Sequence, residues 1–183
     1  MATEDPFVAT AQMVAAKVLA SPLYIDRGVP LLYQVTVDNA LSITVDVKKP
    51  VRGRSSFETD LCVLERKSDQ VSIPRVVLEF KTGITTHDIL TYSAKAQRHK
   101  QIYPYLRYGI VASREASVPS RVFTHNQALD FFAAVKGLEG AELEAFFSDL
   151  LRAEVESSKR LESIAYEKQA TRLFRSEILL KAL

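Results

Sequence analysis

The stretch from residue 57 to residue 81 constrains this chain more than any other part of the sequence. It holds two runs of strand-forming residues, 57–65 and 75–81, joined by a polar connection that suits a hairpin. The second run is apolar until Glu79 and Lys81 interrupt its end. Side chains two positions apart on a strand point to the same face, so an acid and a base are presented together there. Charges in an apolar strand are costly, so this position needs an explanation.

The composition is that of one globular domain. The chain has 183 residues, of which 47% are hydrophobic and 25% are charged, and its formal net charge is only +2. The single Cys62 excludes an intramolecular disulfide and suits a reducing compartment. No segment approaches the ~20 apolar residues of a membrane span, and Glu4 and Asp5 stand where a signal peptide would be basic. We therefore expect a cytoplasmic protein without membrane contact.

The pattern before the hairpin predicts one helix and two strands. Apolar residues recur at helical spacing over 3–20, and Ser21-Pro22 should end that helix. A first strand is expected near 31–37, and residues 41–47 alternate between apolar and polar side chains, which is typical of a half-buried strand. Asp38-Asn39 suits a tight turn between them. We expect these strands to form a meander that leads into the hairpin, with Asp26 in a loop before it.

The pattern after the hairpin predicts a crossover and a long final helix. Thr85-Thr86 can cap a helix over 87–103, and the apolar strand at 106–112 should then run parallel to 75–81. We next expect a short strand at 122–124, a helix that Asn126 caps and Gly137 closes, and an amphipathic helix over 140–168. Residues 173–180 are apolar enough for a terminal strand or helical end. The predicted fold is α/β, with a mixed sheet flanked by helices.

Two groups of cations are candidates for contacting a polyanion. Residues 48–54 carry four cations and no acid, namely Lys48, Lys49, Arg52 and Arg54. This composition suits either a phosphate-contacting loop or a solvated turn. Between residues 95 and 121, six Lys or Arg side chains oppose the single acid Glu115. In this basic region we expect nucleic-acid contacts from Lys95, Arg98 and Lys100.

The spacing of Asp60 and Glu79-Phe80-Lys81 resembles the signature of the PD-(D/E)xK nuclease superfamily, which includes many restriction endonucleases. The predicted order of helix, meander, helix and strand matches that family's core. Lys81-Thr82-Gly83 and the segment from Gln101 to Tyr105 also resemble the Lys-Thr-Gly and Gln-xxx-Tyr pattern of RecB-like nucleases. The resemblance covers about residues 3–112, and departs from the family pattern at Thr59 and at Pro104. It implies a restriction-endonuclease-like core over 1–138, followed by a C-terminal helical extension over 139–183.

This resemblance implies a metal-dependent DNA endonuclease of the restriction or repair type. Asp60 and Glu79 would hold Mg²⁺, or Mn²⁺ in its place, together with the carbonyl oxygen of Phe80. Lys81 would position the attacking water or stabilise the transition state, and Gln101 would orient water or substrate. Tyr105 would join the cations at the DNA. A homodimer through the apolar C-terminal helix would let two sites cut two strands.

Each feature also has a structural explanation. Glu79 and Lys81 could be an ion pair at a sheet edge, although their hairpin setting favours the catalytic interpretation. Cys62 is expected in the core, and the three histidines lack the spacing of metal ligands. The alternative function is a non-catalytic nucleic-acid-binding or assembly module on a nuclease scaffold. A third hypothesis is a helical oligomerisation protein without a nucleic-acid role.

Overall fold

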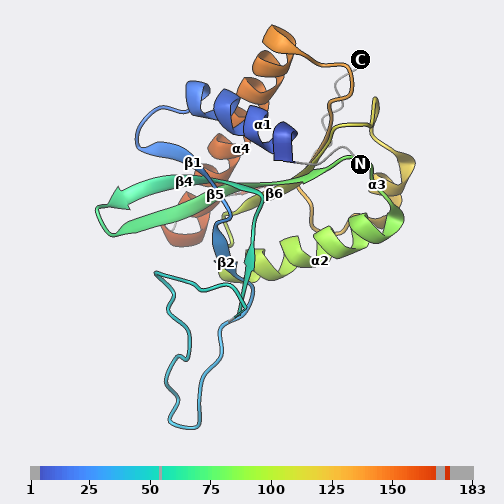
Figure 1. Ribbon diagram of the computed structural model, residues 1–183. Helices are drawn as coiled ribbons and strands as arrows, with labels where there is room; N and C mark the ends of the chain where they lie inside the picture. The colour runs from blue at the N-terminus through green and yellow to red at the C-terminus, as the bar shows by residue number, and fades with distance from the viewer. Residues whose placement is uncertain (1–4, 54, 168–171, 174–183) are drawn as a thin grey trace.

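The computed structural model describes residues 5–53, 55–167 and 172–173. In this part of the chain, strands form a five-stranded sheet in the order β1-β4-β5-β6-β7 and a two-stranded sheet of β2 and β3. Figure 1 shows the elements in chain order: α1 (Asp5–Val18), β1 (Leu23–Arg27), β2 (Pro30–Leu32), β3 (Ser56–Glu58), β4 (Leu61–Ser68), β5 (Val71–Lys81), α2 (Thr86–Ile102), β6 (Arg107–Ala112), α3 (Ser120–His125), β7 (Phe131–Ala134) and α4 (Gly140–Tyr166). The protein is thus an α/β protein with a mixed sheet flanked by helices and a long C-terminal helix.

Strand direction changes at β5, in the centre of the sheet. β1, β4 and β5 are antiparallel neighbours, and Leu61 of β4 lies opposite Leu78 of β5. β5, β6 and β7 run parallel, and Glu79 of β5 lies beside Ile110 of β6. Parallel neighbours need a crossover connection, which α2 supplies between β5 and β6. The predicted hairpin, crossover helix and parallel strand are therefore confirmed, but the first predicted strand, 57–65, is divided: β3 pairs with β2, and the hairpin begins with β4 at Leu61.

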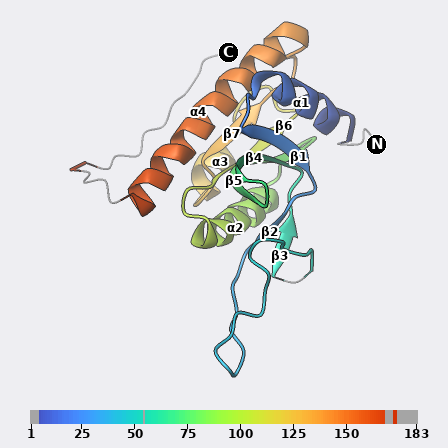
Figure 2. The ribbon, with the colours of Figure 1, turned by 90° about the vertical axis from the view of Figure 1, so that its left-hand side faces the viewer.

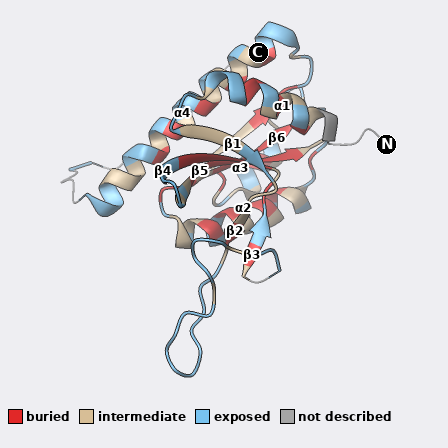
Figure 3. Ribbon diagram, turned by 60° about the vertical axis from the view of Figure 1, so that its left-hand side comes forward, coloured by how far each residue is buried: buried red, intermediate tan, exposed pale blue. Residues whose placement is uncertain are grey.

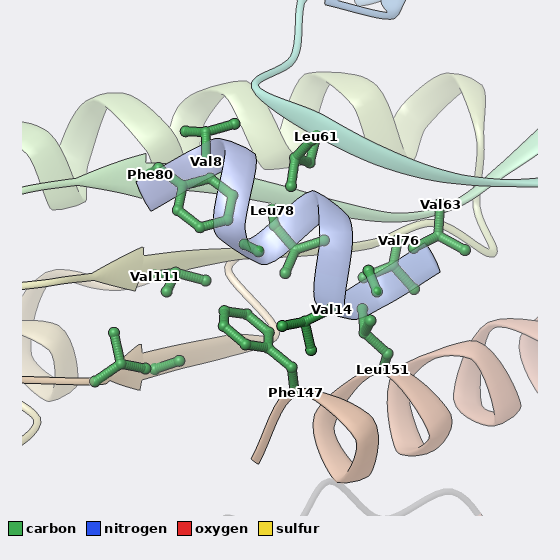
Figure 4. Packing of buried hydrophobic residues seen from close by; sticks show 14 of the residues in the cluster. Val8, Val14, Leu61, Val63, Val76, Leu78, Phe80, Val111, Phe147 and Leu151 are labelled. Atoms are coloured by element: carbon green, nitrogen blue, oxygen red, sulfur yellow. The ribbon is translucent and has the colours of Figure 1, made fainter. Parts of the chain in front are cut away.

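Helices cover the two faces of the sheet as separate layers. α1 and α4 lie together on one face, and α2 lies on the other (Figures 1 and 2). Figure 4 shows how the α1 and α4 layer packs apolar side chains against the strands. The apolar stripe of α4 follows helical spacing, and its members are buried in this core: Leu143, Phe147, Leu151 and Val155. These four side chains are thus covered within the chain, whereas Phe146 and Leu150 are only partly buried and Ile164 is exposed.

The start of α2 is fixed by the capping residues that the sequence contains. The Thr85 hydroxyl accepts a hydrogen bond from the backbone N–H of Asp88 at 3.2 Å, and the Asp88 carboxylate accepts one from the N–H of Thr85 at 2.8 Å. This reciprocal pair is a capping box, which satisfies backbone donors at the helix start. Because the cap comes only a few residues after β5 ends, the first turns of α2 lie beside the carboxyl end of that strand. None of the helices in the described ranges is long and apolar enough to span a membrane.

The segment between β2 and β3 differs most from the predicted strands. Strands are predicted near 31–37 and, from the alternation, over 41–47, but only Leu31 and Leu32 of this segment enter a sheet. Residues 33–53 and 55 instead form a protruding segment, here called the arm, with an isolated bridge between Val37 and Ile43 (Figure 1). The first strand of the meander is β1, which contains Asp26 where a loop was expected. The alternation was therefore wrong as a sign of burial.

The region between β6 and α4 also corrects the prediction. Residues 120–125 form the short helix α3 where a strand was expected, and residues 131–134 form β7 where a helix was expected. The side-chain oxygen Oδ1 of Asn126 accepts hydrogen bonds from the N–H groups of Ala128 and Leu129, so it stabilises a turn instead of capping a helix. Elements of four to six residues are too short for helical and strand periodicity to be distinguished. The element expected over 173–180 lies, beyond Leu173, outside the described residues.

Candidate active site

Asp60 and Glu79 meet where the β4–β5 hairpin opens. Leu61 is paired with Leu78, so the antiparallel register puts Asp60 opposite Glu79 on one face of the sheet. The Asp60 carboxylate accepts a hydrogen bond from the backbone N–H of Phe80 at 2.7 Å. This bond holds the Asp60 side chain against the end of β5. The two acids that the sequence singled out are therefore neighbours, on the face that α2 covers.

Glu79 is a buried carboxyl group with a polar partner. Its side chain accepts a hydrogen bond from the hydroxyl of Tyr108, a fully buried residue of β6. Burial, and then the charge of Asp60, raises the pKa of Glu79 to about 7. The Tyr108 hydrogen bond and the Lys95 cation act in the opposite direction without offsetting that rise. The acid pair consequently holds a proton close to neutral pH, and a bound cation would relieve the repulsion between the two carboxylates.

Two lysines approach the acids around a single aromatic ring. The Nζ atom of Lys81 lies 5.4 Å from the centre of the Tyr92 ring, and that of Lys95 lies 4.7 Å from the same centre. Lys95 also lies 5.5 Å from the Phe57 ring centre, over β3. Tyr92 and Lys95 are three residues apart on α2 and so share one face of the helix. Burial, and then the charge of Glu79, raises the pKa of Tyr92, so the ring lies close to the acid pair.

Gln101 lies away from the acids and lysines around Tyr92. It is exposed near the end of α2, nine positions after Tyr92, and therefore about 14 Å further along the helix axis. The helix ends at Ile102, so the segment from Gln101 to Tyr105 is not helical throughout. Phe80 contributes its backbone to the site, while its ring packs edge-on against Phe7 in the opposite layer, 5.4 Å between ring centres. The role of its carbonyl as a metal ligand stays a prediction.

Four of the predicted DNA-contacting cations are on the surface. Lys48, Lys49 and Arg98 are exposed. Arg52 is exposed as well, and its guanidinium is 2.9 Å from the Glu58 carboxylate. Arg54 lies outside the described residues. The exposed cations come from the arm and from α2.

Lys100 and Tyr105 were predicted to contact DNA, but both make contacts within the chain. The ammonium of Lys100 lies 2.6 Å from the Asp130 carboxylate and donates to the carbonyl of Ala128 at 2.6 Å. Tyr105 is buried, with the guanidinium of Arg75 5.5 Å from its ring centre. Both residues therefore tie α2 and its following loop to the rest of the chain instead of facing a partner.

Sequence reasoning missed Tyr108 and misplaced Asp26. Tyr108 reaches Glu79 because β6 runs parallel to β5 with Val77 beside Tyr108, a register that no local pattern reveals. Asp26 is on β1, where it pairs with Cys62 of β4, so the two side chains share one face of the sheet. Burial, and then the charges of Asp26 and Glu79, raises the pKa of Cys62. A buried thiol that stays protonated is a core residue, as the sequence predicted, and not a nucleophile.

The chemistry of the donor set fits a hard divalent cation. Mg²⁺ is commonly held by one or two carboxylates, with water and substrate phosphate oxygens completing its shell. Asp60 and Glu79 are such a pair. Within residues 5–53, 55–167 and 172–173, no group of three or more His, Cys, Asp or Glu side chains is arranged to hold a metal ion. A cation at this site would therefore depend on the acid pair together with water and a bound phosphate group.

The interpretation of this site comes from its geometry and chemistry. It consists of the acids Asp60 and Glu79, the lysines Lys81 and Lys95, and the tyrosines Tyr92 and Tyr108. No protein-family model matches the chain, and no curated protein matches its sequence.

Proposed function

We propose that this protein is a metal-dependent DNA endonuclease that hydrolyses phosphodiester bonds at the Asp60–Glu79 site. The supporting observation is that two neighbouring acids and two lysines gather on one face of the sheet, around Tyr92. Phosphodiester hydrolysis builds negative charge on the phosphoryl oxygens and needs an oriented water molecule. Acids that can hold a hard cation, with lysines beside them, suit both requirements. The resemblance to PD-(D/E)xK nucleases in Asp60, Glu79 and Lys81 suggests DNA as the substrate.

Asp60 and Glu79 would hold Mg²⁺ or Mn²⁺, with the Phe80 carbonyl oxygen as a further ligand. When bound, such an ion supplies charge neutralisation at the phosphate and an acidified water. Glu79 would give up its proton on binding, because the carboxylate is the ligand form. The Tyr108 hydroxyl donates to the Oε1 atom of Glu79, and the Glu79 carboxyl group also shares a hydrogen bond with Asp60. Tyr108 thereby restricts the orientations that this carboxylate can adopt.

The two lysines would have separate tasks. Lys81 is on β5 two residues after Glu79, where it would position the attacking water or stabilise the transition state. Lys95 comes from α2 and would bind the phosphate group that is cut. Their shared contact with the Tyr92 ring limits the movement of both ammonium groups. The surface cations Lys48, Lys49, Arg52 and Arg98 would contact the neighbouring DNA backbone.

A plasmid-cleavage assay with matched variants tests this function. We expect the wild type to cut DNA with Mg²⁺ and to stop in EDTA. Asp60→Asn and Lys81→Met should reduce cleavage about 10²-fold or more. Their matched controls are Asp69→Asn and Lys159→Met, which change an exposed acid and an exposed lysine away from the site.

Three results would contradict an endonuclease. These are equal cleavage by the site variants and their controls, cleavage that persists in EDTA, and absence of cleavage by the wild type on any form of DNA. Salt-dependent DNA binding without cleavage would point instead to a non-catalytic nucleic-acid-binding module on the same scaffold.

A further inference from the structure

The arm presents one apolar face and one polar face. Val37 lies opposite Ile43 in the bridge at its tip, while the hydroxyl oxygens of Thr36 and Thr44 are 2.6 Å apart. Neighbouring residues of an extended strand point to opposite faces. The odd-numbered face of the bridge therefore carries Val37 and Ile43, and further aliphatic residues follow in the arm sequence: Val35, Leu41, Val45 and Val47. The even-numbered face carries Thr36 and Thr44.

Hydrogen bonds and ring stacking hold the arm in this form. The Asp38 carboxylate accepts hydrogen bonds from the N–H groups of Ala40 at 2.8 Å and Ser42 at 3.0 Å, which closes the turn at the tip. At the root, the ring of Tyr33 stacks on that of Phe57 with 4.2 Å between centres. The aliphatic side chains at the tip are thus presented by a hydrogen-bonded turn closed by one bridge, and the root of the arm packs on β3.

This face is exposed within the chain. Val37 is 58% exposed, Ile43 60% and Val47 53%, and Leu41 at the tip is 83% exposed. Figure 3 shows that most of the arm is exposed where it projects away from the sheet and helices. An isolated two-stranded ribbon is only marginally stable, and contiguous exposed apolar side chains usually mark a contact surface. The arm therefore has the properties of a surface that another molecule covers.

A second copy of the chain fits this surface better than DNA does. The odd-numbered residues of the arm tip carry no charge, and the cations Lys48 and Lys49 follow that part of the arm. DNA recognition needs cations on the contacting face. In a two-fold interface a patch meets its own copy, so an uncharged aliphatic patch is self-complementary and meets no like-charge repulsion. We propose that the odd-numbered face of the arm packs against the same face of a second copy of this chain.

The arm is also a stronger candidate for a dimer interface than α4, the helix that the sequence analysis proposed. Four apolar side chains of α4 are buried in the chain's own core, and the large exposed apolar side chains of that helix are Ile164 and Tyr166, near its end. The arm leads through β3 directly to Asp60. Pairing of two arms would hence set the spacing of two acid pairs, although the pairing itself does not depend on the proposed nuclease activity.

Oligomeric state, measured by sedimentation of the full chain over a wide range of concentration, tests the proposal. Ile43→Lys places a charge on the odd-numbered face, and Ser42→Lys adds the same charge one residue away on the other face. We expect the wild type and Ser42→Lys to form concentration-dependent dimers, and Ile43→Lys to dissociate about tenfold more readily or further. Ile164→Lys, on α4, should behave like the wild type. Unchanged melting of Ile43→Lys would show that the fold survives, because its side chain is exposed.

Cysteine cross-linking gives a second readout. The single native Cys62 is buried, so a new surface thiol would be the reactive one. Val37→Cys should form a disulfide-linked dimer on oxidation, and Thr36→Cys should not. A wild type that is monomeric at every concentration, or an Ile43→Lys dimer as strong as the wild type, would overturn the proposal. So would dissociation by Ile164→Lys alone, which would place the contact on α4, or DNA-dependent protection of the arm in a monomer, which would make DNA the partner.

Discussion

Tyr108 of β6 donates its hydroxyl hydrogen bond to the Glu79 carboxylate of β5. The two strands are parallel, with Val77 beside Tyr108 and Glu79 beside Ile110, so the donor stands on the neighbouring strand two positions before the acid. The hydroxyl is buried, and this bond is one of the influences that lower the pKa of Glu79. Tyr108 is therefore a positioning residue for the candidate metal ligand.

Tyr108→Phe should weaken Mn²⁺ binding at neutral pH by about tenfold, because groups that orient a ligand typically contribute that much to metal affinity. The pKa of Glu79 should rise further, since the variant loses a hydrogen bond that lowers it. Calorimetric titration of Mn²⁺ measures the affinity without any activity assay. Tyr105→Phe is the control, because Tyr105 is buried away from the acid pair. Equal affinities for the two variants would show that the Tyr108 hydroxyl does not orient Glu79.

The raised pKa of Glu79 predicts a loss of stability as pH rises in the absence of metal. The folded protein holds the proton up to about pH 7, whereas the unfolded chain releases it near pH 4.5. Between these values the folded state binds more protons, so the free energy of unfolding falls with increasing pH. The interval corresponds to a contribution on the order of 3 kcal/mol, present below pH 4.5 and lost above pH 7.

Urea unfolding of the wild type and of Glu79→Gln in EDTA, across this pH range, measures that contribution. Glutamine does not titrate, so the stability of the wild type relative to Glu79→Gln should decline from pH 4.5 to pH 7 and then level off. Asp60→Asn should reduce the decline, because the charge of Asp60 is the second cause of the raised pKa of Glu79. A constant difference between wild type and Glu79→Gln would show that Glu79 is ionised normally.

Lys95, and not Gln101, should be the functional residue of α2. Lys95 is over the Tyr92 ring beside Glu79, while Gln101 is exposed near the end of the helix. Lys95→Met should reduce kcat/KM for DNA cleavage about 10²-fold, as expected for the loss of a cation at a reacting phosphate. Gln101→Ala should stay within about twofold, since surface changes away from a site have small effects. The reverse order of effects would mean that α2 presents its other face to the substrate.

Arg75 should be the most costly single ion-pair residue to remove. Its fully buried guanidinium donates to Glu65 at 2.7 Å and also bonds the Glu162 carboxylate, which ties α4 to the sheet. Arg75→Met should lower the free energy of unfolding by about 3 to 5 kcal/mol, because two partly buried acids lose their buried cation and keep only the more exposed Lys67. The control is Arg160→Met, whose exposed pair with Glu156 should contribute less than about 1 kcal/mol. Urea unfolding measures the free energy of unfolding of both variants. Similar losses would show that the Arg75 ion pairs do not tie α4 to the sheet.

The local sequence pattern was sufficient to predict the helices and strands whose periodicity is strong and long. The hairpin over β4 and β5, α2 with its Thr85 cap, the parallel β6 and the long α4 are confirmed. It was sufficient as well for the neighbouring acids Asp60 and Glu79, because their separation is set by one hairpin whose register is local. Short elements such as α3 and β7 were assigned wrongly, since four to six residues contain too little periodic information.

Tertiary structure decided which of these residues work together. Tyr108 and Lys95 reach Glu79 through a parallel register and a crossover helix, contacts between segments that no local pattern connects. The arm shows the opposite case. Its sequence alternates like a half-buried strand, yet no other part of the described chain covers Val37 and Ile43. Sequence alone thus determined the acids, their spacing and the strands that carry them. Which side chains surround those acids, and which apolar faces are left exposed, depends on long-range packing that only the folded chain specifies.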